Sequence, residues 1–430
     1  MHDTDILTFP GARSAPRPLH ERLVLRALEG MNRGLLFLRL PDGEVLRIGS
    51  PDATHVAAMN IMRPEFFTKC ILYGDVGFSE AYVDGDWETD DITAVISWFL
   101  LNIDNAPTIS GSRRKLRIFN LLRTANRIAH RLRDNTLRGS QRNIRAHYDL
   151  SNELFSRFLD PGMTYSSAYF SRPQLTLHEA QTEKYDRLCR QLRLQATDRV
   201  LEIGSGWGGF AIHAATNYGC HVTTMTISAE QFQYARERIR REGLQDRIDI
   251  RLQDYRTMTG TFDKVVSIEM LEAVGHRHLE TFFRKCHEVL KKDGLLGMQV
   301  IISPDSRYDS LRKGVDWIQK HIFPGSLLPS IARINQAINA TGDMFLHDLK
   351  DLGLHYERTL RLWRDNFNRN IRGVRDLGFD DRFVRTWNYY LSYCEAAFAM
   401  RNISVVQMIY TRPNNALLRR HGGQESHGIF

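Results

Sequence analysis

The residues best suited to chemistry begin with a run of glycines after an apolar segment. Residues 200–210 read VLEIGSGWGGF, so an apolar strand ends near Glu202 and a helix follows. The glycines between them are Gly204, Gly206, Gly208 and Gly209. Because glycine lacks a Cβ atom, this backbone can turn tightly and bring its amides close to a ligand. Strand, glycines and helix in this order predict a nucleotide-binding turn.

The spacing of the glycines indicates which nucleotide binds. The pattern is GxGxGG, whereas a dinucleotide fold uses GxGxxG and an acidic residue at the end of the second strand. Here the second predicted strand ends at Met225-Thr226 and continues into a polar run. Asp254 closes the third predicted strand, where a carboxylate can accept the adenine amino group or serve as an ordinary surface residue. The pattern favours S-adenosylmethionine over NAD.

The elements that must position these residues alternate between helix and strand beyond Ala180. Predicted strands at RVLEI, HVTTMTI, IDIRLQD and FDKVVSIE are separated by helical segments such as AEQFQYARERIRREG. This alternation predicts a doubly wound parallel sheet in an α/β domain. The tail from Pro324 is helical and aromatic in pattern, and we expect it to cover the sheet and wall a pocket.

The first hundred residues predict a second, smaller α+β domain. A helical stretch, LHERLVLRALEGM, precedes GLLFLRL and EVLRIG, which flank Pro41-Asp42-Gly43 and predict a hairpin. The stretch GDVGFSEAYVDGDWETDD is rich in glycine and acidic residues and predicts a loop or turn-rich edge. We therefore divide the chain into an N-terminal α+β domain at 19–105, a helical linker at 106–143 and a catalytic domain at 144–430.

The linker is strongly basic. Residues 110–145 hold eleven Lys or Arg against one acidic residue, Asp134, and their apolar residues follow helical spacing. Three interpretations stay open: a solvated helix that packs on its own protein, a helix at an anionic membrane surface, and a nucleic-acid contact. The run has no aromatic platform beyond Phe119, which argues against nucleic acid.

Composition narrows the class of protein. A chain of 430 residues with 42% hydrophobic residues can fold into two domains, and its +8 formal charge suits a polyanionic partner. The five cysteines are widely spaced with no CxxC pair, so we expect neither a metal site nor a disulfide framework. The start of the chain does not resemble a signal peptide, and the longest apolar stretch, Ile92–Leu101, is too short to span a bilayer.

Several motifs in order resemble the cyclopropane-fatty-acyl-phospholipid synthase family. They are HYDLSNELFSRFLDPGMTYSSAYF, LEIGSGWGGF, TISAEQ, LQDYR, SIEMLEAVGHRHLETFFRKCHEVLKKDG, IFPGSLLPS and YYLSYCEAAFAMRNISVVQ. The resemblance is strong over residues 140–412 and looser in front. It implies a Rossmann-like class I methyltransferase fold, S-adenosylmethionine as methyl donor and an unsaturated phospholipid as substrate. It also implies a cytoplasmic protein peripheral to the inner face of the membrane, with a homodimer as the suggested assembly and lipid binding as a role for the front domain.

The resemblance also implies roles for single residues. The positions that it assigns to the cofactor are Tyr165, Ser166, Glu202, Gly204, Ser205, Gly206, Trp207, Gly208, Gly209, Thr226, Ile227, Ser228, Gln231, Asp254 and Tyr255. Glu272 and Tyr356 match positions that hold a bicarbonate ion beside the reacting carbon. Cys394 matches a cysteine often named as the active site, although a methyl transfer to an alkene needs no nucleophile and a buried core thiol is the alternative.

Three departures from the family pattern fall in the bicarbonate pocket. Ser167 stands for a cysteine, Ala273 for a histidine and Gln299 for another histidine. Serine and glutamine can donate hydrogen bonds to an anion, but they supply neither a thiolate nor a titrating imidazole. The leading expectation is a cyclopropane product, and a methylene- or methyl-branched product is the alternative. A small-molecule N- or C-methyltransferase and a non-catalytic lipid-binding protein are the other hypotheses.

Overall fold

The computed structural model describes residues 7–8, 16–104 and 150–419, so the basic run at 110–145 lies outside the described residues. Two compact units emerge, and each is described by itself. Unit 1 contains residues 1–134, 306–325 and 356–403. Unit 2 contains residues 135–305, 326–355 and 404–430. The three-part division predicted from sequence and the role of the basic linker stay predictions.

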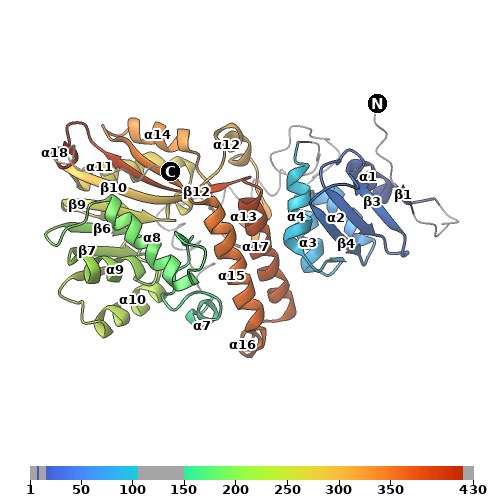
Figure 1. The fold of residues 1–430 in the computed structure, drawn as a ribbon, viewed down its shortest axis with the longest axis horizontal. Helices are drawn as coiled ribbons and strands as arrows, with labels where there is room; N and C mark the ends of the chain where they lie inside the picture. Colours follow the sequence, from blue (N-terminus) through green and yellow to red (C-terminus); the bar gives the residue numbers. More distant parts are fainter. Residues whose placement is uncertain (1–6, 9–15, 105–149, 420–430) are drawn as a thin grey trace. The chain divides into compact units, whose positions relative to one another are not determined.

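Unit 2 is built on a seven-stranded sheet (Figure 1). Its strands are β6 (Arg199–Ile203), β7 (His221–Thr226), β8 (Ile248–Leu252), β9 (Phe262–Ile268), β10 (Leu290–Ile302), β11 (Phe345–Asp351) and β12 (Ser404–Thr411). Their order is β11-β12-β10-β9-β6-β7-β8, and β6 to β10 pair in parallel. The predicted α/β sheet is therefore confirmed, and the carboxyl ends of β6, β7 and β9 meet at one edge.

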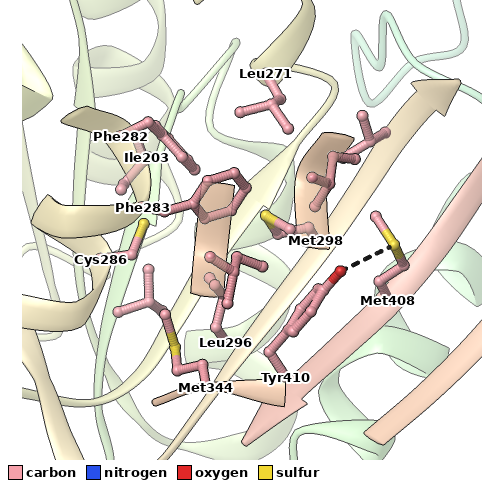
Figure 2. Close-up of a cluster of buried hydrophobic side chains, with 14 of the residues drawn as sticks. Ile203, Leu271, Phe282, Phe283, Cys286, Leu296, Met298, Met344, Met408 and Tyr410 are labelled. Atoms are coloured by element: carbon pink, nitrogen blue, oxygen red, sulfur yellow. Dashed lines mark hydrogen bonds between the residues drawn. The ribbon is translucent and has the colours of Figure 1, made fainter. Parts of the chain in front are cut away.

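Helices cover both faces of this sheet. On one face, α8 (Leu177–Gln191), α9 (Gly209–Tyr218) and α10 (Ala229–Arg241) bury Leu188, Phe210 and Ile239. On the other, α11 (Leu279–Val289) and α14 (Ile331–Asn339) pack over the strands. Figure 2 shows Phe282, Phe283 and Cys286 of α11 directed toward Leu296 and Met298 of β10. Burial on both faces explains why the strands are continuously apolar.

The tail corrects one expectation from the sequence. The pattern from Pro324 predicts helices that cover the sheet, but β12 and β11 extend the sheet itself. β12 pairs antiparallel with β10, and β11 pairs antiparallel with β12. All of β12 except Ser404 is buried, and a short continuous apolar run does not distinguish a buried strand from a buried helix.

Unit 1 contains a five-stranded sheet of order β1-β3-β2-β4-β5. The strands are β1 (Leu7–Thr8), β2 (Leu35–Arg39), β3 (Val45–Gly49), β4 (Val56–Ile61) and β5 (Trp87–Glu88). The helices that lie wholly or mainly in this unit are α1 (Leu19–Leu28), α2 (Glu65–Tyr73), α3 (Asp75–Val83), α4 (Ile92–Leu101), α12 (Asp305–Leu311), α13 (Trp317–His321), α15 (Gly353–Arg369), α16 (Ile371–Asp376) and α17 (Asp381–Ala399). The antiparallel pairing of β2 with β3 confirms the predicted hairpin.

The first half of the glycine- and acid-rich stretch after Tyr73 is helical, contrary to the expected loop or turn-rich edge, whereas residues 84–91 form turns and the edge strand β5. α3 buries Val76, Ala81 and Val83, and its Gly77 lies so close to α2 that a Cβ atom there would approach the Lys69 carbonyl oxygen to 2.0 Å. Gly77 therefore serves close helix packing. Tertiary burial outweighed the weak local preference for helix.

Unit 1 also encloses an apolar cavity of about 90 Å³. Its walls come from α1, β2, β4, α2, α3, α4 and α17, and they include Leu28, Met59 and Phe99. Among the described residues, no helix is long and apolar enough to cross a membrane.

Candidate active site

The glycine turn lies where the sequence placed it, between β6 and α9. Gly204, Gly206 and Gly208 have φ angles of +97°, +49° and +87°, a backbone region in which a side chain is strained. The Gly204 and Ser205 amides both donate to the Met225 carbonyl at the end of β7. These bonds join the turn to the neighbouring strand.

Two glycines in this turn serve different purposes. A Cβ atom on Gly209 would lie 2.6 Å from the Tyr185 hydroxyl, so this glycine permits close packing of α9 on α8. A Cβ atom on Gly206 would meet no atom within 4 Å. The backbone at Gly206 requires glycine and borders open space, so a ligand can lie directly against it. This arrangement fits the binding of S-adenosylmethionine.

An aromatic group borders the turn. Trp207 is buried, and its indole N–H donates to Asn152 Oδ1 over 2.7 Å. The Phe155 ring from α7 (Asn152–Ser156) lies 5.1 Å from the Trp207 ring and 5.2 Å from the Tyr165 ring. This packing brings the predicted cofactor residue Tyr165 into one cluster with the glycine turn.

A buried lysine joins the segment around Ser166 to the site. Lys184, on α8, is fully buried and donates from Nζ to Ser166 Oγ over 2.6 Å. Burial lowers the pKa of Lys184, against the attraction of Glu269, Asp160 and Glu202. Sequence reasoning missed this residue, although a lysine between Ala180 and Leu188 interrupts the apolar stripe of α8 and is a usable signal.

Glu202 is a buried carboxyl at the end of β6. It accepts a hydrogen bond from the Thr224 hydroxyl over 2.6 Å. Burial raises the pKa of Glu202 to about 8, and the Thr224 bond and the Lys184 charge oppose this rise. The folded protein therefore holds this proton more tightly than the unfolded chain.

That proton predicts a pH dependence of stability. A glutamate with a pKa raised from 4.5 to about 8 stabilises the fold at low pH, and this contribution declines as the pH rises from about 4.5 to about 8. In Glu202→Gln we expect the fall in the free energy of unfolding between pH 5 and pH 7 to shrink by about 1–2 kcal/mol. Denaturant melts at both pH values measure this, with the exposed Glu237→Gln as control. A slope equal to that of the wild type would contradict the assignment.

The polar run after β7 forms a local network. Thr226 Oγ1 donates to Gln231 Oε1 over 2.9 Å, and Ser228 accepts from the Gln231 amide as it caps α10. Ile227, between them, is half-buried. These bonds hold the strand end where the sequence predicted the ribose contacts, and those contacts stay a prediction.

Asp254 and Tyr255 lie beyond β8. Both oxygens of Asp254 accept from the Arg256 guanidinium, over 2.8 and 2.7 Å. Tyr255 packs edge-on against Phe282 with ring centroids 5.3 Å apart. The carboxylate predicted to meet the adenine is thus already paired with its neighbour, and Tyr255 offers an apolar wall beside it.

A second carboxylate, which the sequence analysis did not single out, stands at the end of β9. Glu269 Oε1 accepts the Ser167 backbone N–H over 2.8 Å and Gln299 Nε2 over 2.7 Å. Its φ angle of +47° is unusual for a residue with a side chain. The surrounding structure must hold Glu269 in this conformation, as is common at functional sites. The two predicted site residues Ser167 and Gln299 thus meet on Glu269.

Glu272 lies one turn further on, in η2 (Leu271–Ala273). Its Oε1 accepts the Ile301 backbone N–H, while Oε2 is buried with no hydrogen-bond partner among the described residues. Burial raises the pKa of Glu272 to about 8, and the charge of Glu269 adds to the rise. Glu272 therefore tends to keep its proton at neutral pH. Ala273 is exposed.

The bicarbonate ion implied by the family resemblance does not fit these residues. The Gln299 side chain, which was expected to donate to the ion, donates to Glu269, and so does the Ser167 backbone N–H. The Ser167 hydroxyl donates to the Ala168 carbonyl over 3.1 Å. An added anion would compete for the same donors and meet the negative charge of Glu269.

The remaining two predicted residues belong to unit 1. The Tyr356 ring packs against Phe398 with centroids 4.5 Å apart. Cys394, on α17, is half-buried, and burial raises the pKa of its thiol, with Asp316 adding to the effect. A raised pKa disfavours the thiolate that a nucleophile needs. These properties support the interpretation of Cys394 as a core thiol.

Comparison with known proteins places the chain in a family. The model of the mycolic acid cyclopropane synthetase family matches residues 135–408. The chain belongs to that family. It is therefore a methyltransferase that depends on S-adenosylmethionine.

Two relatives are similar to this chain over most of its length. It is 37% identical over 383 residues to tuberculostearic acid methyltransferase UfaA1 of Mycobacterium tuberculosis, across 87% of this chain and 88% of the relative. It is 35% identical over 370 residues to cyclopropane-fatty-acyl-phospholipid synthase of Escherichia coli strain K12, across 83% and 88%. The solved mycolic acid cyclopropane synthase CmaA1, complexed with SAH and CTAB, matches with a TM-score of 0.59 and 29% identity, across 63% of this chain and 98% of that one. The predicted class I methyltransferase fold is confirmed.

Proposed function

We propose that the protein transfers the methyl group of S-adenosylmethionine to a carbon of a cis double bond in a phospholipid acyl chain, and that the product carries a cyclopropane ring. The observation that carries this proposal is the Glu269–Glu272 pair at the end of β9. An alkene that accepts a methyl group becomes a carbocation and must then lose a proton from carbon. A carboxylate held beside the cofactor turn supplies a base for that step.

The pair lies next to the cofactor turn because β9 and β6 are neighbours in the sheet. A Cβ atom on Gly204 would lie 3.1 Å from Met270, the residue that follows Glu269. When bound, S-adenosylmethionine supplies an electrophilic methyl group. The protein's own residues orient the alkene, exclude water and hold the base, and effective positioning of this kind lowers the barrier substantially.

A branched product is the second candidate. The 37% identical relative is named as a methyltransferase and the 35% identical one as a cyclopropane synthase, so the family holds both descriptions. Ser167 and Gln299 also alter the surroundings of the cation. If proton loss follows a hydride shift, a methylene group forms in place of a ring.

Product analysis tests the proposal. Purified protein is incubated with labelled S-adenosylmethionine and vesicles of a monounsaturated phospholipid, and the product is examined by NMR. We expect label in the lipid and cyclopropane proton signals. Vesicles of saturated phospholipid and a soluble amine are the control acceptors. Alkene-methylene signals would favour the branched product, and transfer to the amine alone would overturn the proposal.

The site of action is a further part of the proposal. A cytoplasmic protein that works at the inner membrane face should act faster on anionic vesicles than on neutral ones, and salt should reduce the difference. The apolar cavity of unit 1 supports a lipid-binding role for that unit. Equal rates on both kinds of vesicle at low salt would speak against an electrostatic membrane contact.

A further inference from the structure

Resting on the proposed function, we propose that Glu269 is the proton acceptor of the reaction and takes the place of an external bicarbonate ion. The disagreement between the expected anion pocket and the observed one leads to this inference. Of the two residues expected to donate to the ion, Gln299 donates through its side chain, and Ser167 through its backbone N–H, to a carboxylate that belongs to the chain itself. Such a base needs no ion from solution.

Two hydrogen bonds orient the Glu269 side chain. Ser167 N–H and Gln299 Nε2 both donate to its Oε1 atom. Glu269 is half-buried. A carboxylate held in one orientation beside the cofactor turn can accept a proton.

A chain of side chains fixes the orientation of the Gln299 amide. Gln299 on β10 lies directly opposite Gln407 on β12. The Arg187 guanidinium donates to Gln407 Oε1 over 2.7 Å, and Gln407 Nε2 donates to Gln299 Oε1 over 3.0 Å. Because arginine can only donate, the Gln407 oxygen faces the guanidinium and the Gln407 N–H₂ group faces the Gln299 oxygen. The Gln299 N–H₂ group must then face Glu269. Arg187, Gln407 and Gln299 are thus positioning residues.

The alkene electron pair forms a C–C bond to the methyl carbon as the S–CH₃ bond breaks, and the sulfur keeps that bond's electrons. The second alkene carbon is then cationic. A C–H bond of the new methyl group breaks, its electron pair closes the ring, and the proton goes to the Glu269 carboxylate and is then relayed through the Glu272 carboxyl to solvent.

Removing the carboxylate tests the proposal. Glu269→Gly suits the positive φ angle, so the fold should persist, while turnover should fall by about 100-fold or more. Because the deletion opens space beside the Ser167 amide, added formate or bicarbonate should raise the rate of the Glu269→Gly variant by about tenfold or more. Glu269→Gln should lose activity without such rescue, since its amide fills the space. The measurements are rates on unsaturated phospholipid vesicles and melting temperatures.

Arg193→Gly is the matched control. Arg193 also has a positive φ angle, of +54°, and its guanidinium donates to the Leu417 carbonyl, away from Glu269. It should retain wild-type activity. Three results would each overturn the role of Glu269. They are a wild type whose turnover requires added bicarbonate, an active Glu269→Gln variant, and a Glu269→Gly variant that no added carboxylate rescues. A wild type that does not methylate unsaturated lipid would instead refute the proposed function.

The relay predicts a separate effect on product formation. Arg187→Met should lower kcat about tenfold with little change in KM and shift the ratio of ring to branched product, because Gln299 then holds Glu269 less firmly. Arg187→Lys keeps a donor to Gln407 and should largely restore both values. Kinetics and product NMR measure this. An Arg187→Met variant with unchanged kcat and product ratio would remove the relay from the mechanism.

Discussion

Glu272→Gln is expected to lower the turnover of methyl transfer by about 100-fold while leaving the fold intact. Glutamine has the shape of a protonated glutamate and can still accept the Ile301 N–H through its oxygen. It cannot release or take up a proton. A buried carboxyl whose Oε2 atom finds no partner among the described residues is costly for the fold, and its presence beside Glu269 is explained by a role in the proton transfer.

Three measurements separate this effect from a structural one. The affinity for S-adenosylmethionine by calorimetry and the melting temperature should stay close to those of the wild type, while kcat falls. The exposed Glu237→Gln on α10, a residue with no assigned role in the site, should behave as the wild type. Full activity in Glu272→Gln would exclude a proton-transfer role for this residue.

Gly206→Ala should raise the dissociation constant for S-adenosylmethionine by about 30-fold, which corresponds to about 2 kcal/mol. The methyl group enters space that is open in the protein alone and that we assign to the ligand. It also strains a backbone held at a φ angle of +49°. The loss should therefore appear mainly in binding.

Gly243→Ala controls for the strain. Gly243 follows α10 and has a φ angle of +68°, and a Cβ atom there would likewise meet no atom within 4 Å. Both variants should lose similar stability, of about 1 kcal/mol, but Gly243→Ala should bind S-adenosylmethionine normally. Equal affinities of the two variants for S-adenosylmethionine would contradict the assignment of the space beside Gly206 to this ligand.

Residues close together in the chain were predictable because their geometry is local. The glycine turn needs only the backbone preferences of residues 200–210 and the strand and helix that flank them. The β2–β3 hairpin likewise depends on an alternating pattern around a short turn. The helix α3 was missed because its stability comes from burial against α2, and no local pattern reports that burial.

The base and its support were decided by tertiary structure. Glu269 reads in the sequence as one more residue after a strand, and only the fold brings Ser167 N–H and Gln299 onto its carboxylate. Gln299 and Gln407 lie 108 residues apart and meet through the register of β10 with β12. Sheet register follows from the packing of the whole unit. The sequence alone therefore determined the cofactor turn and the family. The tertiary structure determined which carboxylate is placed to accept the proton in the last step of the proposed reaction.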